Sequence, residues 1–110
     1  MAKVRLNSKQ IKDWKSFHLL CKSKFGFPDF YGTNMNAWID CLSCLDNEEE
    51  DRMSRFTLEK GELLHIEISD TEDFNSRLPE IFDALVECSA FVNRRYVDDG
   101  KPPVLSLLFL

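Results

Sequence analysis

Segments with the pattern of short strands alternate along this chain with segments of helical periodicity, and this order limits the folds available to it. Apolar residues recur in strand-like runs at residues 3–6, 62–69 and 104–110, and at helical spacing from about residues 13, 35 and 79. Such alternation is typical of an α/β domain with a small parallel sheet and right-handed crossovers. A chain of 110 residues is expected to form one such domain, over residues 1–110.

Turn and capping residues set the expected boundaries of these segments. Asp13 is placed to cap the first helix, which is expected to end near residue 25 because Gly26 follows it. Thr33 or Asn34 is expected to cap the second helix. Residues 70–78 are expected to form a loop with a short helical turn. The final strand, 104–110, is almost entirely apolar, and we expect it to be buried on both faces.

The second helix has two predicted faces. One is an apolar stripe for the core, formed by Met35, Trp38, Leu42 and Leu45. The other carries an amide, a carboxylate and a hydroxyl with an isoleucine near them, and these residues are Asn36, Asp40, Ser43 and Ile39. The helix therefore offers polar groups on a rigid element, although a polar helix face is by default an ordinary solvated surface.

Charge is distributed unevenly over the chain, whose formal net charge is −5. Residues 1–24 hold seven basic side chains and one acid, whereas residues 25–51 hold seven acids and no base. The net charge argues against binding to nucleic acid through phosphate neutralisation. The acidic block favours a cationic partner, or else it is a solvated helix end and loop, and charge alone leaves both interpretations open.

Membrane insertion and export are not expected from the sequence. The longest apolar run, 104–110, is much shorter than the ~20 residues that a membrane-spanning helix needs. The first residues contain no apolar segment of the kind that a secretory signal requires. We therefore expect a cytoplasmic protein.

Catalytic, cofactor and metal sites are also not expected. Cys41 and Cys44 form a C-x-x-C pair, which could serve redox chemistry or half a zinc site, but buried thiols are the favoured interpretation. His18 and His65 are isolated and are expected to be structural. No phosphate-binding or nucleophile motif occurs, so we predict a protein that is not an enzyme and needs no cofactor or metal.

The segment from Phe27 to Asp40, FPDFYGTNMNAWID, resembles the central segment of the barstar family, intracellular inhibitors of the ribonuclease barnase. The family pattern is an apolar residue, proline, an acid, an aromatic, tyrosine and glycine, followed by asparagine and later by aspartate. The likeness extends without a gap over about residues 3–45. Beyond residue 45 it rests on the order of the predicted elements.

This resemblance implies a three-stranded parallel sheet packed by helices, with a binding surface on the second helix and the loop before it. The family's surface blocks a ribonuclease active site, and Asp40 matches the carboxylate that mimics substrate phosphate. The other implied contact positions are Phe30, Asn34, Met35, Asn36, Ala37, Ile39, Ser43, Cys44, Leu45 and, on the last helix, Glu87. The implied protein is an immunity protein that neutralises a nuclease toxin and is a monomer when free.

The chain also departs from the family pattern. Asn36 stands where the family has a second acid, and Phe91 replaces a glutamate on the last helix. Ile39 and Leu45 replace tryptophans, while the acids at 46–51 offer charge elsewhere. The same mode of inhibition with a different target is therefore expected. Two alternatives remain open, namely a regulatory module that binds a protein other than a ribonuclease, and a thiol enzyme that uses the C-x-x-C pair.

Overall fold

Three parallel strands form the sheet in the computed structural model, which describes residues 2–47 and 52–110. They are β1 (Ala2–Leu6), β2 (Leu64–Ile68) and β3 (Leu105–Phe109), in the order β1-β2-β3. Val4 pairs with Ile66, which pairs in turn with Leu107. The prediction of an α/β fold with a three-stranded parallel sheet is confirmed. The acids at residues 48–51, which the sequence analysis counted in the acidic block, lie outside the described residues.

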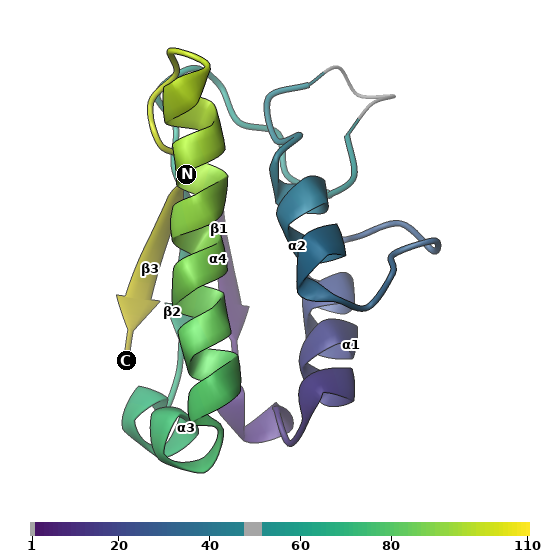
Figure 1. The fold of residues 1–110 in the computed structure, drawn as a ribbon, viewed down its shortest axis with the longest axis vertical. Helices are drawn as coiled ribbons and strands as arrows, with labels where there is room; N and C mark the ends of the chain where they lie inside the picture. Colours follow the sequence, from purple (N-terminus) through teal and green to yellow (C-terminus); the bar gives the residue numbers. More distant parts are fainter. Residues whose placement is uncertain (1, 48–51) are drawn as a thin grey trace.

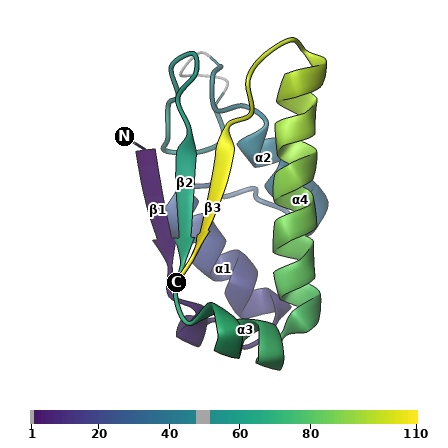
Figure 2. The same cartoon turned by 90° about the vertical axis from the view of Figure 1, so that its left-hand side faces the viewer.

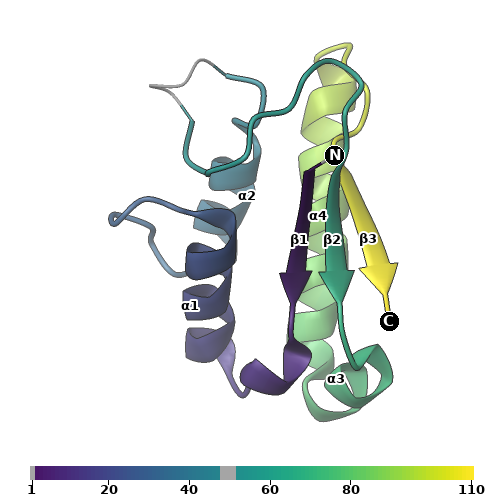
Figure 3. The same ribbon diagram turned by 180° about the vertical axis from the view of Figure 1, so that it is seen from behind.

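The helical elements are the 3₁₀ turn η1 (Ser8–Gln10), α1 (Trp14–Phe25), α2 (Met35–Leu42), α3 (Thr71–Arg77) and α4 (Pro79–Asp98). Helices α1, α2 and α4 lie on one side of the sheet, whereas η1 and α3 lie beyond the carboxyl ends of the strands (Figures 1 and 2). Figure 3 shows the opposite face of the sheet with no described helix over it. The long helix α4 runs along the sheet, and α2 packs beside α4. This arrangement leaves the outer surfaces of α2 and α4 exposed next to each other.

The core fills the space between the sheet and the helices. Alternate residues of β1 and β2 point into it, because successive side chains of a strand face opposite sides of the sheet. Its largest fully buried side chains are those of Trp38, Phe17, Phe25 and Phe74. The opposite face of the sheet is partly charged, and Lys3 and Glu67 form an ion pair of 3.8 Å there. The sheet thus has one dry face and one face in contact with water.

The structure corrects the prediction that the last strand is buried on both faces. β3 lies at the edge of the sheet, where Leu108, Phe109 and Leu110 are 43%, 48% and 55% exposed. The Asn93 amide covers the start of this edge, because its Oδ1 accepts from Leu105 N at 2.8 Å and its Nδ2 donates to Leu105 O at 3.0 Å. Apolar composition misled the prediction, since it does not distinguish an edge strand from a central one.

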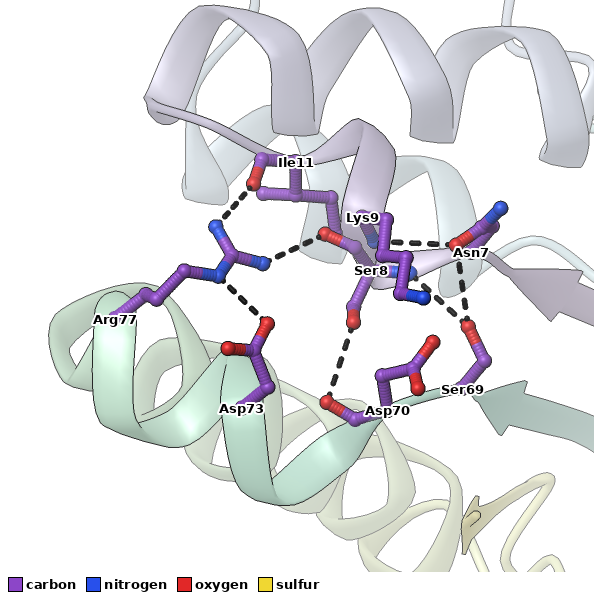
Figure 4. A network of polar contacts seen from close by, with 8 residues as sticks. All are labelled: Asn7, Ser8, Lys9, Ile11, Ser69, Asp70, Asp73 and Arg77. Carbon is purple, nitrogen blue, oxygen red and sulfur yellow. Dashed lines mark hydrogen bonds and ion pairs between the residues drawn. The ribbon is translucent and has the colours of Figure 1, made fainter.

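Residues 70–78, expected as a loop with a short turn, contain the helix α3 instead. Arg77 at its end joins α3 to the segment after β1 (Figure 4). The guanidinium donates to Ile11 O and Ser8 O at 3.0 Å each and pairs with Asp73 at 2.7 Å. These contacts join segments more than 60 residues apart in the sequence. The helix therefore owes its place to partners that local periodicity does not reveal.

Gly26 ends α1 at a point where no other residue fits without strain. Its φ is +71°, and a Cβ added there would lie 2.8 Å from Arg55 Cβ. The close approach arises because Arg55 N donates to Phe25 O at 2.8 Å and Arg55 Nε donates to Lys24 O at 2.9 Å. The loop that contains Arg55 is thereby fastened to the end of α1.

We expect Gly26→Ala to lower the free energy of unfolding by about 2 kcal/mol, through left-handed strain and the clash with Arg55 together. Urea denaturation measures this loss. Gly100→Ala is the matched control, because Gly100 has a φ of +78° but open space around an added Cβ. The control should lose about 1 kcal/mol. Equal losses at the two glycines would show that the contact with Arg55 has no energetic weight.

Candidate functional site

The carboxylate of Asp40 stands on the outer face of α2. Its side chain is 59% exposed, whereas Trp38, two residues earlier, is completely buried. Trp38, Leu42 and Leu45 belong to the core, and Met35 packs partly against it. The predicted division of this helix into a packing face and a polar face is confirmed. Because its other side is packed in the core, α2 presents Asp40 from a firmly held backbone.

Asn34 fixes the start of α2. Its Oδ1 accepts from Ala37 N at 2.8 Å, and its Nδ2 donates to Gly32 O at 3.1 Å. This confirms one of the two expected caps. Thr33, the other candidate, has a positive φ of 51° and precedes the cap. The Asn34 side chain is therefore occupied in shaping the turn between the aromatic loop and the helix.

The loop before α2 holds one aromatic ring outward and two inward. Phe30 is 77% exposed, the highest fraction among the large exposed apolar side chains. Phe27 and Tyr31 are buried, with ring centroids 4.7 Å apart. The Tyr31 hydroxyl lies 2.6 Å from Nδ1 of His18, which is also buried. Contacts in the core thus anchor the loop that displays Phe30, and His18 has the structural role expected for it.

The buried position of His18 predicts a dependence of stability on pH. Burial lowers the pKa of His18 below its ordinary value of 6.5, because the charged ring loses water. The neutral ring contributes its full stability above pH 6.5, and this contribution is lost as the pH falls through the lowered pKa of the folded state. We expect the urea midpoint to fall between pH 7.5 and pH 5, and His18→Gln to reduce that fall. An unchanged fall in the variant would assign the acid sensitivity to other groups.

Most of the implied contact residues are at least partly exposed. Phe30, Asn34, Asn36, Asp40 and Glu87 are exposed, and the partly buried members are Met35, Ala37, Ser43 and Cys44. These residues come from the aromatic loop, α2 with the turn after it, and α4, and we call them the acidic-helix surface.

Two of the implied contact residues are core residues, and the acidic-helix surface excludes them. Ile39 is 9% exposed and Leu45 is 1% exposed. Leu45 extends the stripe of Trp38 and Leu42, and its N–H donates to the hydroxyl of Tyr96 at 3.0 Å. Helix α2 packs against α4, and Trp38, Ile39 and Leu42 all belong to the core cluster, so its buried arc is wider than one stripe. Ile39 in α2 and Leu45 in the turn after it are therefore packed in the core of the free protein.

Arg95 is a member of the surface that sequence reasoning missed. Its Nη1 lies 3.1 Å from Asp40 Oδ1 and 3.2 Å from Ser43 Oγ. Its guanidinium carbon lies 5.2 Å from the centre of the Phe91 ring, which is 50% exposed. Glu87, Phe91 and Arg95 follow one another at intervals of four residues, which places them on one side of α4. That spacing is visible in the sequence, but the approach of α4 to Asp40 is not.

The cysteine pair does not have the properties of a redox site. Cys41 is buried, and this burial raises the pKa of its thiol to about 11. Redox cysteines instead have a lowered thiol pKa. Cys44 donates its S–H to Asp40 O at 3.4 Å. The thiols therefore act as packing and hydrogen-bonding groups around the end of α2.

Within the described ranges, 2–47 and 52–110, no helix is both long enough and apolar enough to cross a membrane. Nor do those ranges bring together three His, Cys, Asp or Glu side chains in a group that could hold a metal ion.

The sequence profile of the family described as Barstar (barnase inhibitor) matches residues 1–107 of the 110-residue chain. The match extends well beyond residues 3–45, the segment in which the likeness of individual residues is strongest. No curated protein matches the chain. The profile covers nearly all of the sequence, and the chain belongs to the barstar family.

Proposed function

We propose that this protein inhibits a ribonuclease by placing the acidic-helix surface over the enzyme's active site. The observation that carries the proposal is the position of Asp40, which is exposed on a helix whose opposite face is buried. Phe30 stands beside this helix as an exposed aromatic on an anchored loop. Family membership supports the same function, because barstar-family proteins are inhibitors rather than enzymes.

The proposed mechanism follows from the chemistry of ribonuclease active sites. Such a site uses cationic side chains to hold the phosphate of RNA. A carboxylate presented by a rigid helix can pair with those cations in place of the phosphate and thereby exclude the substrate. Asp40 would supply that carboxylate, and Phe30 would supply apolar contact beside it. The inhibitor forms no covalent bond and requires no cofactor in this mechanism.

We further propose that the free protein is a monomer that acts in the cytoplasm of its producer, as an immunity protein against a nuclease toxin. The distribution of charge supports a basic target, since residues 25–51 hold seven acids and no base. Long-range attraction between an acidic surface and a basic nuclease would speed their encounter.

A regulatory module with a partner other than a ribonuclease is the second candidate. Two observations favour it, because both reduce the negative charge of the surface. Asn36 is uncharged where the family has an acid, and Arg95 pairs with Asp40 at 3.1 Å. A neighbouring gene for a small basic secreted domain would favour inhibition, and the absence of such a gene would favour regulation.

Capture from the native host tests the proposal. The wild-type protein, Asp40→Ala and Glu80→Ala serve as parallel baits, and each eluate is assayed for ribonuclease activity after the inhibitor has been dissociated. Glu80 is an exposed acid in the first turn of α4, about 20 Å along that helix from Arg95. We expect activity from the wild-type and Glu80→Ala baits and much less from Asp40→Ala. Recovery of a partner without ribonuclease activity would replace inhibition by the regulatory function.

A further inference from the structure

A cation lies within the acidic-helix surface, beside the carboxylate proposed to meet the nuclease. The side chain of Arg95 is 45% exposed, and its Nη1 is shared between Asp40 Oδ1 at 3.1 Å and Ser43 Oγ at 3.2 Å. This contact joins α4 to α2 across 55 residues of sequence. The charge of Asp40 is therefore partly neutralised in the free protein.

Arg95 is held in this position from two sides. Asp40 and Ser43 fix one end of the guanidinium, while Phe91 lies under it at 5.2 Å. Arginine favours such an arrangement because its planar group can stack on a ring and donate hydrogen bonds at the same time. An arginine held by three neighbours is a stable feature of the surface rather than a freely moving side chain.

The remaining donors of Arg95 are available to a partner. A guanidinium has five N–H groups, and within the described residues only Nη1 makes hydrogen bonds to other side chains. A nuclease cation that approaches Asp40 therefore comes close to a second positive charge. A nuclease carboxylate in the same region would meet the unused N–H groups. The Asp40–Arg95 pair consequently disfavours a partner that brings only cations and favours one that brings a cation together with a carboxylate.

We propose that Arg95 is a specificity-determining residue, an inference that rests on the proposed function. It disfavours nucleases that bring only cations to Asp40, and it favours a nuclease that presents a carboxylate next to the cation that pairs with Asp40. The contact would then be an alternating row of four charges, two from each protein. Specificity of this kind arises from a repulsive element as much as from an attractive one.

Barnase serves as the probe, because its phosphate-binding cleft tests the effect of cations that approach Asp40. We compare wild type, Arg95→Gln and Arg94→Gln for their dissociation constants and association rates at low salt. Arg94 is the matched control, since it is an exposed arginine of the same helix and forms no ion pair within the described residues. We expect Arg95→Gln to bind barnase about tenfold more tightly than wild type and to associate faster, and Arg94→Gln to change both by less than about threefold.

Two more variants separate this inference from the proposed function, namely Asp40→Asn alone and the double variant with Asp40→Asn and Arg95→Gln. In the double variant the expected result is loss of the affinity gained by Arg95→Gln. If Arg95→Gln binds no more tightly than wild type while Asp40→Asn alone weakens binding, the role of Arg95 is refuted and inhibition through Asp40 stands. A gain that survives Asp40→Asn would also refute the role, because the repulsion would then act elsewhere. Failure of both wild type and Arg95→Gln to bind barnase would also refute the specificity role of Arg95, and the capture experiment would decide the function.

Discussion

Replacing Asp40 by alanine is expected to weaken binding of the target ribonuclease by about 2 kcal/mol or more, which is roughly a 30-fold increase in the dissociation constant. The nuclease cations that pair with the carboxylate would remain desolvated in the complex without a partner. Inhibition titrations or calorimetry with the captured enzyme measure this loss. The variant should fold normally, because the Asp40 side chain is 59% exposed and its ion pair with Arg95 lies at the surface.

Two conservative variants separate the effect of charge from that of shape. Asp40→Asn keeps the size of the side chain and should lose most of the same affinity. Glu80→Gln makes the same change of charge on an exposed residue in the first turn of α4, at the opposite end of that helix from Arg95. This variant should bind like the wild type within about threefold. Equal behaviour of the two variants would show that only the total charge matters, and Asp40 would have no special place at the interface.

Trp38→Ala is expected to have the largest effect on stability, a loss of about 4 kcal/mol in the free energy of unfolding. Trp38 is completely buried, and its ring packs edge-on against Phe25 with centroids 6.2 Å apart. Its removal would leave a large cavity directly beneath the helix that carries Asp40. Urea denaturation measures the loss, and the same variant should bind the nuclease more weakly because its support for α2 is gone.

Trp14→Ala provides the control for this substitution. Trp14 is 38% exposed at the start of α1, where its ring stacks on His18 at 5.8 Å. Loss of a partly exposed ring should cost clearly less than loss of Trp38. If Trp14→Ala destabilised the protein as much as Trp38→Ala, the core would not be organised around the packing face of α2.

The sequence predicted those parts of the fold that depend on local pattern. Helix α1 begins after the Asp13 cap and ends at Gly26, as expected from two residues with strong positional preferences. Parallel pairing followed from the alternation of strands and helices. The edge position of β3 could not be predicted from local pattern, because its apolar sequence reflects contacts with α4 as well as with the sheet. The helix α3 was missed because Arg77 fastens it to Ser8 and Ile11, which are remote in sequence.

In the candidate site, too, local sequence pattern predicted some features, whereas contacts remote in the sequence determined the others. The spacing of residues in α2 is sufficient to place Trp38 inward and Asp40 outward, and the structure places them so. The same spacing cannot reveal that Ile39 is buried or that Arg95 reaches Asp40, since both depend on how α2 packs against the rest of the molecule. The local part of the surface was therefore predictable, whereas its charge balance was not.

The central claim is that the Asp40 carboxylate occupies the phosphate site of a ribonuclease, and competition with a nucleotide tests it most directly. The dissociation constant of the captured ribonuclease for this protein is measured at increasing concentrations of a mononucleotide that binds the same enzyme's active site. If Asp40 occupies that site, the apparent dissociation constant rises in proportion to the nucleotide concentration once the site is saturated. A dissociation constant that stays the same with the nucleotide bound would contradict the account, because both ligands would then fit at once.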